Sequence, residues 1–255
     1  MSRKPQSRKS QSRKPRNSNA RKTFAALALV AAVGLLAIAA VQMLGDDKKP
    51  AKNTAAATET NPAYAQLAKM ARRDAHDPLA LGRADAPVVL VEYSDFQCPF
   101  CKVFATKVEP RLIADYVDQG VLRIEWRSMA IFGAESEDAS RAAWAAGQQG
   151  KFWEYHRALF EHAPEKKNTG AFTRDKLVEL AGAAGVPDVG KFRADLESPA
   201  ATAAVRSDVN EGIGIGVNST PAFLVNGRPI LGAQPLEQFR ATIDAAAKAA
   251  ERDSE

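Results

Sequence analysis

Two cysteines separated by two residues are the side chains of this sequence best suited to chemistry. Cys98 and Cys101 are the only two cysteines among 255 residues, and they follow an apolar run at Val88–Val91. A disulfide between them would close a very short loop and remove little entropy from the unfolded chain. At a strand-to-helix step, an exposed first sulfur gains thiolate character from helix N–H groups, and the second can resolve a mixed disulfide.

The pair therefore predicts thiol–disulfide exchange. The alternatives are an inert local disulfide and a zinc site. No second cysteine pair or Cys/His cluster, which a zinc site would need, accompanies Cys98 and Cys101.

The segments around the pair have a β-α-β pattern. β-branched and aromatic residues predict a strand at 88–93, and apolar spacing predicts a helix from 99 to about 119. In residues 121–126 apolar and polar residues alternate, which predicts a second strand. The cysteine pair would then lie at the beginning of the helix between two strands.

A block with helical spacing follows, from about residue 135 to 209. Its expected helices are 136–149, 151–161, 173–184 and 190–196. Two short strand-like runs, 222–225 and 229–231, flank Asn226-Gly227, a strong hairpin signal, and an amphipathic helix follows to about residue 251. This order predicts a two-layer α/β domain with a helical insertion.

The positive charge of the chain is concentrated at its N-terminus. Residues 1–22 hold nine of the 35 Lys and Arg residues and no acid, so the remaining 26 bases face 30 acids. Because residues 1–23 have almost no apolar content, we expect a disordered basic tail. The folded part has no positive excess, which argues against nucleic-acid binding.

An uncharged apolar segment follows the basic tail. Residues 24–44 are 21 residues without charge, and at a rise of about 1.5 Å per residue such a helix crosses roughly 30 Å of hydrocarbon. The preceding basic residues place the N-terminus in the cytoplasm and the rest outside. This predicts a single-pass membrane anchor; a cleaved signal peptide with a small-x-small site at Ala37–Ala39 is the alternative. Residues 45–75 then form a stalk and 76–255 the folded domain, in an oxidising space.

Three motifs make the chain resemble the DsbA-like thioredoxin-fold proteins. They are Val-Glu-Tyr-Ser-Asp-Phe-Gln-Cys-Pro-Phe-Cys at Val91–Cys101, Lys-Phe-Trp-Glu-Tyr-His at Lys151–His156 and Gly-Val-Asn-Ser-Thr-Pro-Ala-Phe-Leu-Val-Asn-Gly at Gly216–Gly227. The resemblance extends from about residue 85 to 247. It implies a thioredoxin-like fold with a helical insertion, preceded here by the transmembrane helix.

The resemblance also implies roles for five residues. Cys98 is the expected nucleophile and Cys101 the more buried resolving thiol. Pro221, preceded by Thr220, matches the cis-proline of the family, whose loop faces the cysteines and pairs with an extended substrate segment. Glu92 matches the buried acid that exchanges a proton with the resolving cysteine; a solvent-facing strand position is the alternative.

Other residues carry narrower expectations. Phe100 departs from the family pattern, in which a His between Pro and the second Cys helps to stabilise the thiolate, so we expect a less oxidising potential. Asp95 reads as a solvated turn residue, and His156 as a residue packed among the aromatic side chains of its helix. The Gly212-x-Gly214-x-Gly216 run precedes a strand, unlike a dinucleotide fingerprint, and is expected to lead the backbone into the proline loop.

These expectations combine into one function. The resemblance implies a membrane-anchored, extracytoplasmic thiol–disulfide oxidoreductase that forms disulfides in unfolded or partly folded exported proteins and is reoxidised by a quinone-linked membrane partner. Its redox-active group is the Cys98–Cys101 pair, with no other cofactor and no metal. The alternatives are a reductase or isomerase of the same fold, and a tethered binding protein without turnover.

Overall fold

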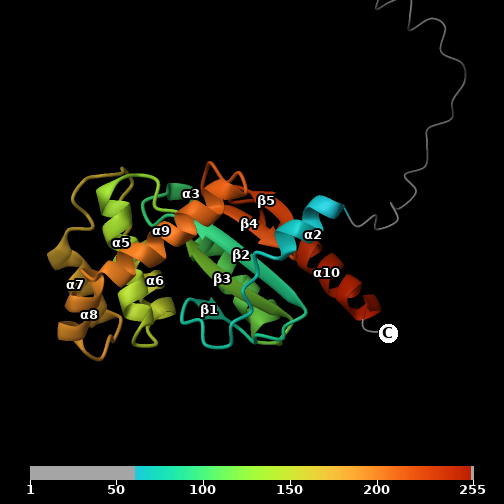
Figure 1. Cartoon of the computed structure of the whole chain (residues 1–255), viewed down its shortest axis with the longest axis horizontal. Coiled ribbons are helices and arrows are strands. Elements are labelled where there is room, and N and C mark those ends of the chain that lie inside the picture. Colours follow the sequence, from blue (N-terminus) through green and yellow to red (C-terminus); the bar gives the residue numbers. More distant parts are fainter. Residues whose placement is uncertain (1–60, 254–255) are drawn as a thin grey trace, which may run out of the picture. The chain divides into compact units, whose positions relative to one another are not determined.

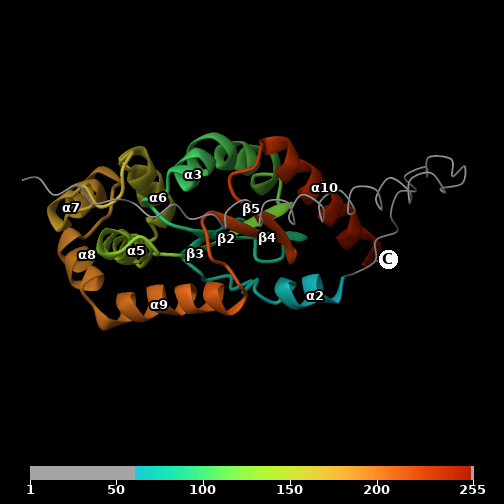
Figure 2. The same ribbon diagram turned by 90° about the horizontal axis from the view of Figure 1, so that it is seen from above.

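The computed structural model describes residues 61–253, which fold around a five-stranded sheet of order β1-β3-β2-β4-β5 (Figures 1 and 2). The strands are β1 (Ala80–Leu81), β2 (Val88–Ser94), β3 (Leu122–Ser128), β4 (Ala222–Val225) and β5 (Arg228–Leu231). The helical segments are α2 (Pro62–Ala68), α3 (Pro99–Val103), η1 (Phe104–Val108), α4 (Glu109–Leu112), η2 (Ile113–Val117), α5 (Ala134–Gly147), α6 (Phe152–Glu161), α7 (Arg174–Ala183), α8 (Val189–Leu196), α9 (Pro199–Gly214) and α10 (Leu236–Asp253). The predicted α/β domain with a helical insertion is confirmed.

The sheet is covered by helices on both faces. Figure 2 shows α3 and α10 on one side of the sheet and α2 and α9 on the other. Successive residues of β2 point to opposite faces of the sheet. Val88 and Leu90 pack with Phe104 and Phe239 on one face. Val89 and Val91 pack with Leu67 and Ile215 on the other. Because β2 is central and buried along its whole length, its near-continuous apolar run is the pattern of a strand covered on both faces.

The strand pairings place the functional loops. β2 and β3 are parallel, with Val88 opposite Leu122, whereas β4 runs antiparallel to β2, with Glu92 opposite Phe223. The end of β2 and the beginning of β4 therefore lie side by side. The predicted hairpin between β4 and β5 is confirmed: Asn226 and Gly227 have φ angles of 44° and 82°, the positive values that a tight two-residue turn requires.

The helix after β2 contains two wide turns. The segments α3, η1, α4 and η2 follow one another without a break, as predicted, but η1 and η2 are π-helical. The Glu109 N–H donates to the Phe104 carbonyl, five residues back, and the next residue, Pro110, has no N–H to donate. Such π-helical turns are rare and often occur at functional sites.

The glycine run before β4 corrects one expectation. Gly212 and Gly214 lie within α9, and only Gly216, with a φ of 88°, follows the helix and leads toward the proline loop. A Cβ on Gly212 would stand 3.0 Å from Met129 Sδ and 3.1 Å from Tyr93 Cδ1. Glycine at this position therefore allows α9 to pack closely on the sheet.

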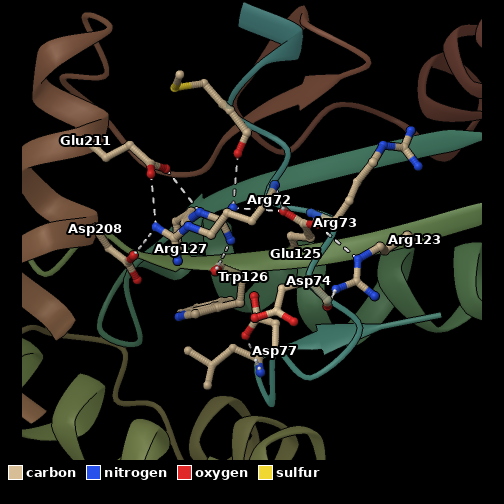
Figure 3. Close-up of polar contacts among 12 residues, drawn as sticks. Arg72, Arg73, Asp74, Asp77, Arg123, Glu125, Trp126, Arg127, Asp208 and Glu211 are labelled. Carbon is tan, nitrogen blue, oxygen red and sulfur yellow. Dashed lines mark hydrogen bonds and ion pairs between the residues drawn. The ribbon is translucent and has the colours of Figure 1, made fainter. Parts of the chain in front are cut away.

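The polar residues of β3 form a buried charge network (Figure 3). Alternation of apolar and polar residues along a strand commonly indicates that the polar face of the sheet meets solvent, but here that face is covered. The Glu125 carboxylate accepts from Arg123 Nε at 3.0 Å and from an Arg127 guanidinium nitrogen at 2.8 Å. It also accepts from the backbone N–H groups of Arg72 and Arg73 at 2.9 and 2.8 Å. The network therefore fixes residues N-terminal to β1 against the sheet.

The same network includes α9. Arg127 Nε lies 3.0 Å from Glu211, and the Arg72 guanidinium lies 2.7 Å from Asp208 and 2.9 Å from Glu211 (Figure 3). Each buried charge thus has an opposite partner and hydrogen bonds, which is the condition under which buried ions are tolerated.

The predicted membrane anchor at residues 24–44 lies outside the described residues, as do residues 45–60 of the expected stalk. Residues 61–75 of that stalk pack against the domain, with α2 close to the β4–β5 turn. Within residues 61–253, none of the helices combines the length and apolar character needed to span a bilayer.

The network predicts a large effect of Glu125 on stability. Replacing Glu125 by Gln leaves Arg123 buried without a carboxylate and Arg127 with Glu211 alone. This should lower the free energy of unfolding by about 3 kcal/mol in urea titrations followed by circular dichroism. The control is Glu237→Gln, whose carboxylate is 78% exposed and paired with Arg240; it should change stability by less than about 1 kcal/mol. Equal unfolding midpoints for the two variants would contradict the prediction.

The effect should also depend on pH. Burial opposes ionisation of Glu125, but the hydrogen bonds from Arg72, Arg123 and Arg127 outweigh it and hold its pKa below the ordinary 4.5. A carboxyl with a lowered folded-state pKa stabilises the protein above its unfolded pKa and loses that contribution as pH falls through the folded one. The stability difference between the native chain and Glu125→Gln should therefore shrink on acidification below pH 4.5.

Candidate active site

The cysteine pair lies at the first turn of α3. Cys98 is the residue that precedes the helix, and Pro99 occupies the first helical position, where its missing N–H costs no hydrogen bond. The Cys98 N–H donates to the Asp95 carbonyl at 3.0 Å, and the Lys102 N–H donates to the Cys98 carbonyl at 3.0 Å. The predicted strand–loop–helix placement of the pair is confirmed.

The two thiols differ in burial less than expected. Cys101 is fully buried, as predicted, but only 3% of Cys98 is exposed, so the expectation of an openly exposed first sulfur is wrong. The cover comes from the proline loop, whose Thr220 carbonyl lies 3.3 Å from Cys98 Sγ. Phe100, between the cysteines, is 67% exposed and is the large apolar side chain that meets solvent here.

The Thr220–Pro221 peptide bond is cis, as the resemblance implies. Its position follows from the sheet: Pro221 directly precedes β4, and β4 pairs with β2, which leads to the cysteines. The Gly232 N–H donates to the Pro221 carbonyl at 2.9 Å and ties the loop to the end of β5. Residues separated by more than 100 positions in sequence are thereby brought together (Cys98 with Thr220).

The environment separates the pKa values of the two thiols. Hydrogen bonding from the Cys101 thiol is the largest influence on Cys98; burial acts against it, and the Thr220 side chain and the N–H groups of Cys101 and Phe100 add to it. Together they lower the pKa of Cys98 to about 6. Burial, the hydrogen bond to Cys98 and its charge raise the pKa of Cys101 well above the ordinary value. The proton of the pair is therefore held on Cys101.

Asp95 is buried, which corrects the expectation of a solvated turn residue. Its carboxylate accepts from the Gln97 N–H at 2.8 Å, the Ser136 hydroxyl at 2.7 Å and the Ile131 N–H at 2.9 Å. Gln97 in turn accepts from the Asn168 N–H at 2.6 Å. The loop that carries Cys98 is thus fastened to the helical insertion, a link without a local signal in the sequence.

Glu92 is fully buried on β2, so the alternative of a solvent-facing position is excluded. Burial raises its pKa to about 8, and the nearby Ser94 hydroxyl offsets only part of that shift. The same hydroxyl lies next to the Cys101 thiol. Glu92 therefore holds a proton near neutral pH at a position close to the resolving cysteine; its role in exchange stays a prediction.

His156 is buried, as predicted, with its ring centroid 5.0 Å from that of Trp126 and 4.9 Å from that of Phe160. Burial lowers its pKa to about 3, so the ring is neutral at physiological pH. Glu109, which the sequence analysis did not single out, lies 3.7 Å away and is also buried. The sequence did contain a signal for the buried position of Glu109, because this acid stands directly before a proline in an otherwise apolar helix face.

Within residues 61–253, no group of three or more His, Cys, Asp or Glu side chains is arranged to bind a metal.

Comparisons with known proteins agree on the fold. A family model described as thioredoxin matches residues 74–245. Disulfide bond formation protein D of Bacillus subtilis is 30% identical over 168 residues, which cover 64% of this chain and 74% of that protein. The crystal structure of oxidised BdbD from the same species has a TM-score of 0.63 at 26% identity and covers 68% of this chain and 94% of its own.

A further relative is much longer than the matched region. Na(+)/H(+) antiporter NhaA 3 of Salinispora tropica is 31% identical over 164 residues, which cover 64% of this chain but only 24% of the antiporter. The similarity therefore concerns about a quarter of that protein.

The pKa difference between the thiols predicts selective alkylation. In the reduced chain, the rate of Cys98 modification by iodoacetamide, measured by peptide mass spectrometry, should rise with a midpoint near pH 6, whereas Cys101 should stay unmodified over that range. The unfolded chain is the control, and its Cys98 should titrate near the ordinary value of 9.0. A midpoint near 9.0 in the folded chain would mean that the helix and the loop do not stabilise the thiolate.

Proposed function

Because this chain belongs to the thioredoxin family, among the DsbA-like thiol–disulfide oxidoreductases, we propose that it introduces disulfide bonds into exported proteins through Cys98 and Cys101. The observation that carries the proposal is the Cys98 sulfur, whose pKa is lowered to about 6 between the first turn of α3 and the Thr220 loop. A thiolate that is stable at neutral pH favours the reduced pair, so the oxidised pair tends to pass its disulfide to a substrate.

The exchange takes place in two displacements. A substrate thiolate attacks Cys98 Sγ, the Cys98–Cys101 bond breaks, and Cys101 leaves as a thiolate that takes up a proton. A second substrate thiolate then attacks the substrate sulfur of the mixed disulfide, and Cys98 leaves as a thiolate. Two electrons pass from the substrate dithiol to the cysteine pair, and the substrate gains one disulfide.

The surroundings of Cys98 suit an extended peptide. The Thr220 backbone lies at the edge of the cysteine pair and offers a place for strand-like pairing with a substrate segment. Phe100 and Val103 are 67% and 48% exposed on the same helix and offer apolar contact to an unfolded chain. Both features favour protein substrates that are not yet folded.

The cellular arrangement completes the proposal. Residues 24–44 would anchor the chain in the membrane, with residues 1–23 in the cytoplasm and the catalytic domain outside. The reduced pair would be reoxidised by a quinone-linked membrane protein, which removes the two electrons. No cofactor beyond the cysteine pair is required for either half of the cycle.

The redox state of the pair in intact cells tests the direction of electron flow. Acid quenching followed by alkylation should trap Cys98 and Cys101 mostly as the disulfide if the chain donates disulfides. A mostly reduced pair would instead support a reductase or isomerase. The Cys98→Ser variant should lose all effect on exported proteins; a retained effect would indicate a tethered binding protein.

The apolar side chain of Phe100 is expected to make the redox potential of the cysteine pair less oxidising. A Phe100→His variant places a hydrogen-bond donor beside Cys98, so it should lower the pKa of Cys98 further and make the pair more oxidising in titrations against glutathione. The control is Val103→His, which adds the same ring at an exposed position further along the helix and should leave the potential nearly unchanged. If the native chain and the Phe100→His variant have the same redox potential, Phe100 does not influence the potential of the cysteine pair.

A further inference from the structure

Four buried polar side chains behind Cys101 lack hydrogen bonds of normal geometry. Ser94 and Glu92 belong to β2, Glu109 to α4 and His156 to α6, and none is more than 4% exposed. The atoms without a partner are both Glu92 carboxyl oxygens, Ser94 Oγ, Glu109 Oε1 and His156 Nε2. They are five of the ten such side-chain atoms in residues 61–253, so half of the unsatisfied groups gather at one place. Buried polar groups without partners are costly, and their concentration calls for a function.

These groups form a continuous path from the resolving cysteine. The Ser94 side chain lies next to both the Cys101 thiol and the Glu92 carboxyl. Glu92 is close enough to Glu109 that the charge of one opposes ionisation of the other. Glu109 Oε2 then lies 3.7 Å from His156 Nδ1.

The surroundings of Glu92 and Glu109 favour the protonated form of both carboxyls. The groups that face Glu109 are Glu92 from β2, His156 from α6 and the exposed Arg157, whose charge acts from a distance. The Ser94 hydroxyl lies next to Glu92 and links it to the Cys101 thiol of α3. His156 is held neutral by burial and supplies no positive charge. Burial raises the pKa of Glu109 well above its ordinary value, and the charge of an ionised Glu92 raises it further. When Glu92 becomes a carboxylate, Glu109 is therefore still an acid with an O–H to donate.

The backbone explains why Glu109 reaches this place. The π-helical turn η1 ends at Val108. The N–H of the next residue, Glu109, bonds to the Phe104 carbonyl, and Pro110 follows directly. His156 faces Glu109 Oε2, which leaves Oε1 without a partner. The π-helical turn η1 and the His156 ring thus define the position of Glu109. An apolar residue would satisfy the packing at this buried position equally well.

We propose that Glu109 is a positioning residue for thiol–disulfide exchange: its protonated carboxyl, which His156 faces, donates a hydrogen bond to the Glu92 carboxylate that forms when Glu92 gives its proton to Cys101. The inference rests on the proposed function. As the substrate thiolate bonds to Cys98 Sγ, the electron pair of the broken disulfide goes to Cys101 Sγ and the proton comes from Glu92. Glu109 keeps its own proton and stabilises the new carboxylate by a charge-assisted hydrogen bond.

The test compares two replacements of Glu109 in the full-length chain. Glu109→Met keeps the volume and removes the donor, whereas Glu109→Gln keeps a donor in its amide. The disulfide form is reduced with dithiothreitol between pH 5 and 10, and the rate constant is calculated per reagent thiolate. In the native chain this constant should fall above about pH 8, where Glu92 loses its proton.

The expected result distinguishes donation from packing. In Glu109→Met the disulfide should be reduced about threefold to tenfold more slowly at pH 7, because Glu92 becomes a weaker acid. For the same reason the break, which is the pH above which the rate constant falls, should move about one pH unit upward. Glu109→Gln should keep most of the native rate. The control Asp118→Asn, an exposed acid at the end of the same helix, should match the native chain.

Two outcomes would overturn the inference: a folded Glu109→Met chain with the native rate and break, or equal losses in Glu109→Met and Glu109→Gln. If Glu109→Met does not fold in urea titrations, His156→Phe decides instead. It keeps the aromatic packing, removes the ring nitrogen that faces Glu109 and should shift the break upward by a smaller amount; an unchanged break would overturn the inference. A native disulfide that opens no faster than that of oxidised glutathione would contradict the proposed function, a separate result.

Discussion

The contact between Cys98 and the Thr220 carbonyl depends on the pairing of β2 with β4. The two strands run antiparallel in the middle of the sheet, so the residues that follow β2 and those that precede β4 meet at one edge. This pairing brings the proline loop over the sulfur at 3.3 Å and leaves little of Cys98 exposed. The proline loop thus both covers Cys98 and contributes to its low pKa, because the residue whose carbonyl contacts the sulfur also places its side chain beside it.

Buried charges in this domain are of two kinds. Around Glu125 every charge has an opposite partner and hydrogen bonds, and the network joins the segment before β1, the sheet and α9 (Figure 3). Around Glu92 and Glu109 the carboxyls have neither, so they bind protons instead of salt-bridge partners. The first arrangement stabilises the fold and the second keeps the carboxyls protonated, a difference that follows from whether a guanidinium lies within hydrogen-bonding distance.

The helical insertion does more than extend the domain. Ser136 of α5 and the Ile131 N–H hold Asp95, which lies in the loop before Cys98. His156 of α6 contacts Glu109 from the same insertion. The insertion therefore contributes to the rigidity of the cysteine loop and to the acids behind it, although neither cysteine belongs to it.

The sequence by itself determined the features that depend on neighbours along the chain. The strand before Cys98, the helix that begins at Pro99, the Asn226-Gly227 turn and the order of the elements follow from local periodicity and turn chemistry, and the motif resemblance added the cis bond at Pro221. Only the tertiary structure decided which polar residues are buried. Asp95, Glu109 and Glu125 look like surface residues in sequence, because each is held in the interior by at least one partner more than 35 residues away. Burial and pairing are properties of the packed domain, and no local pattern records them.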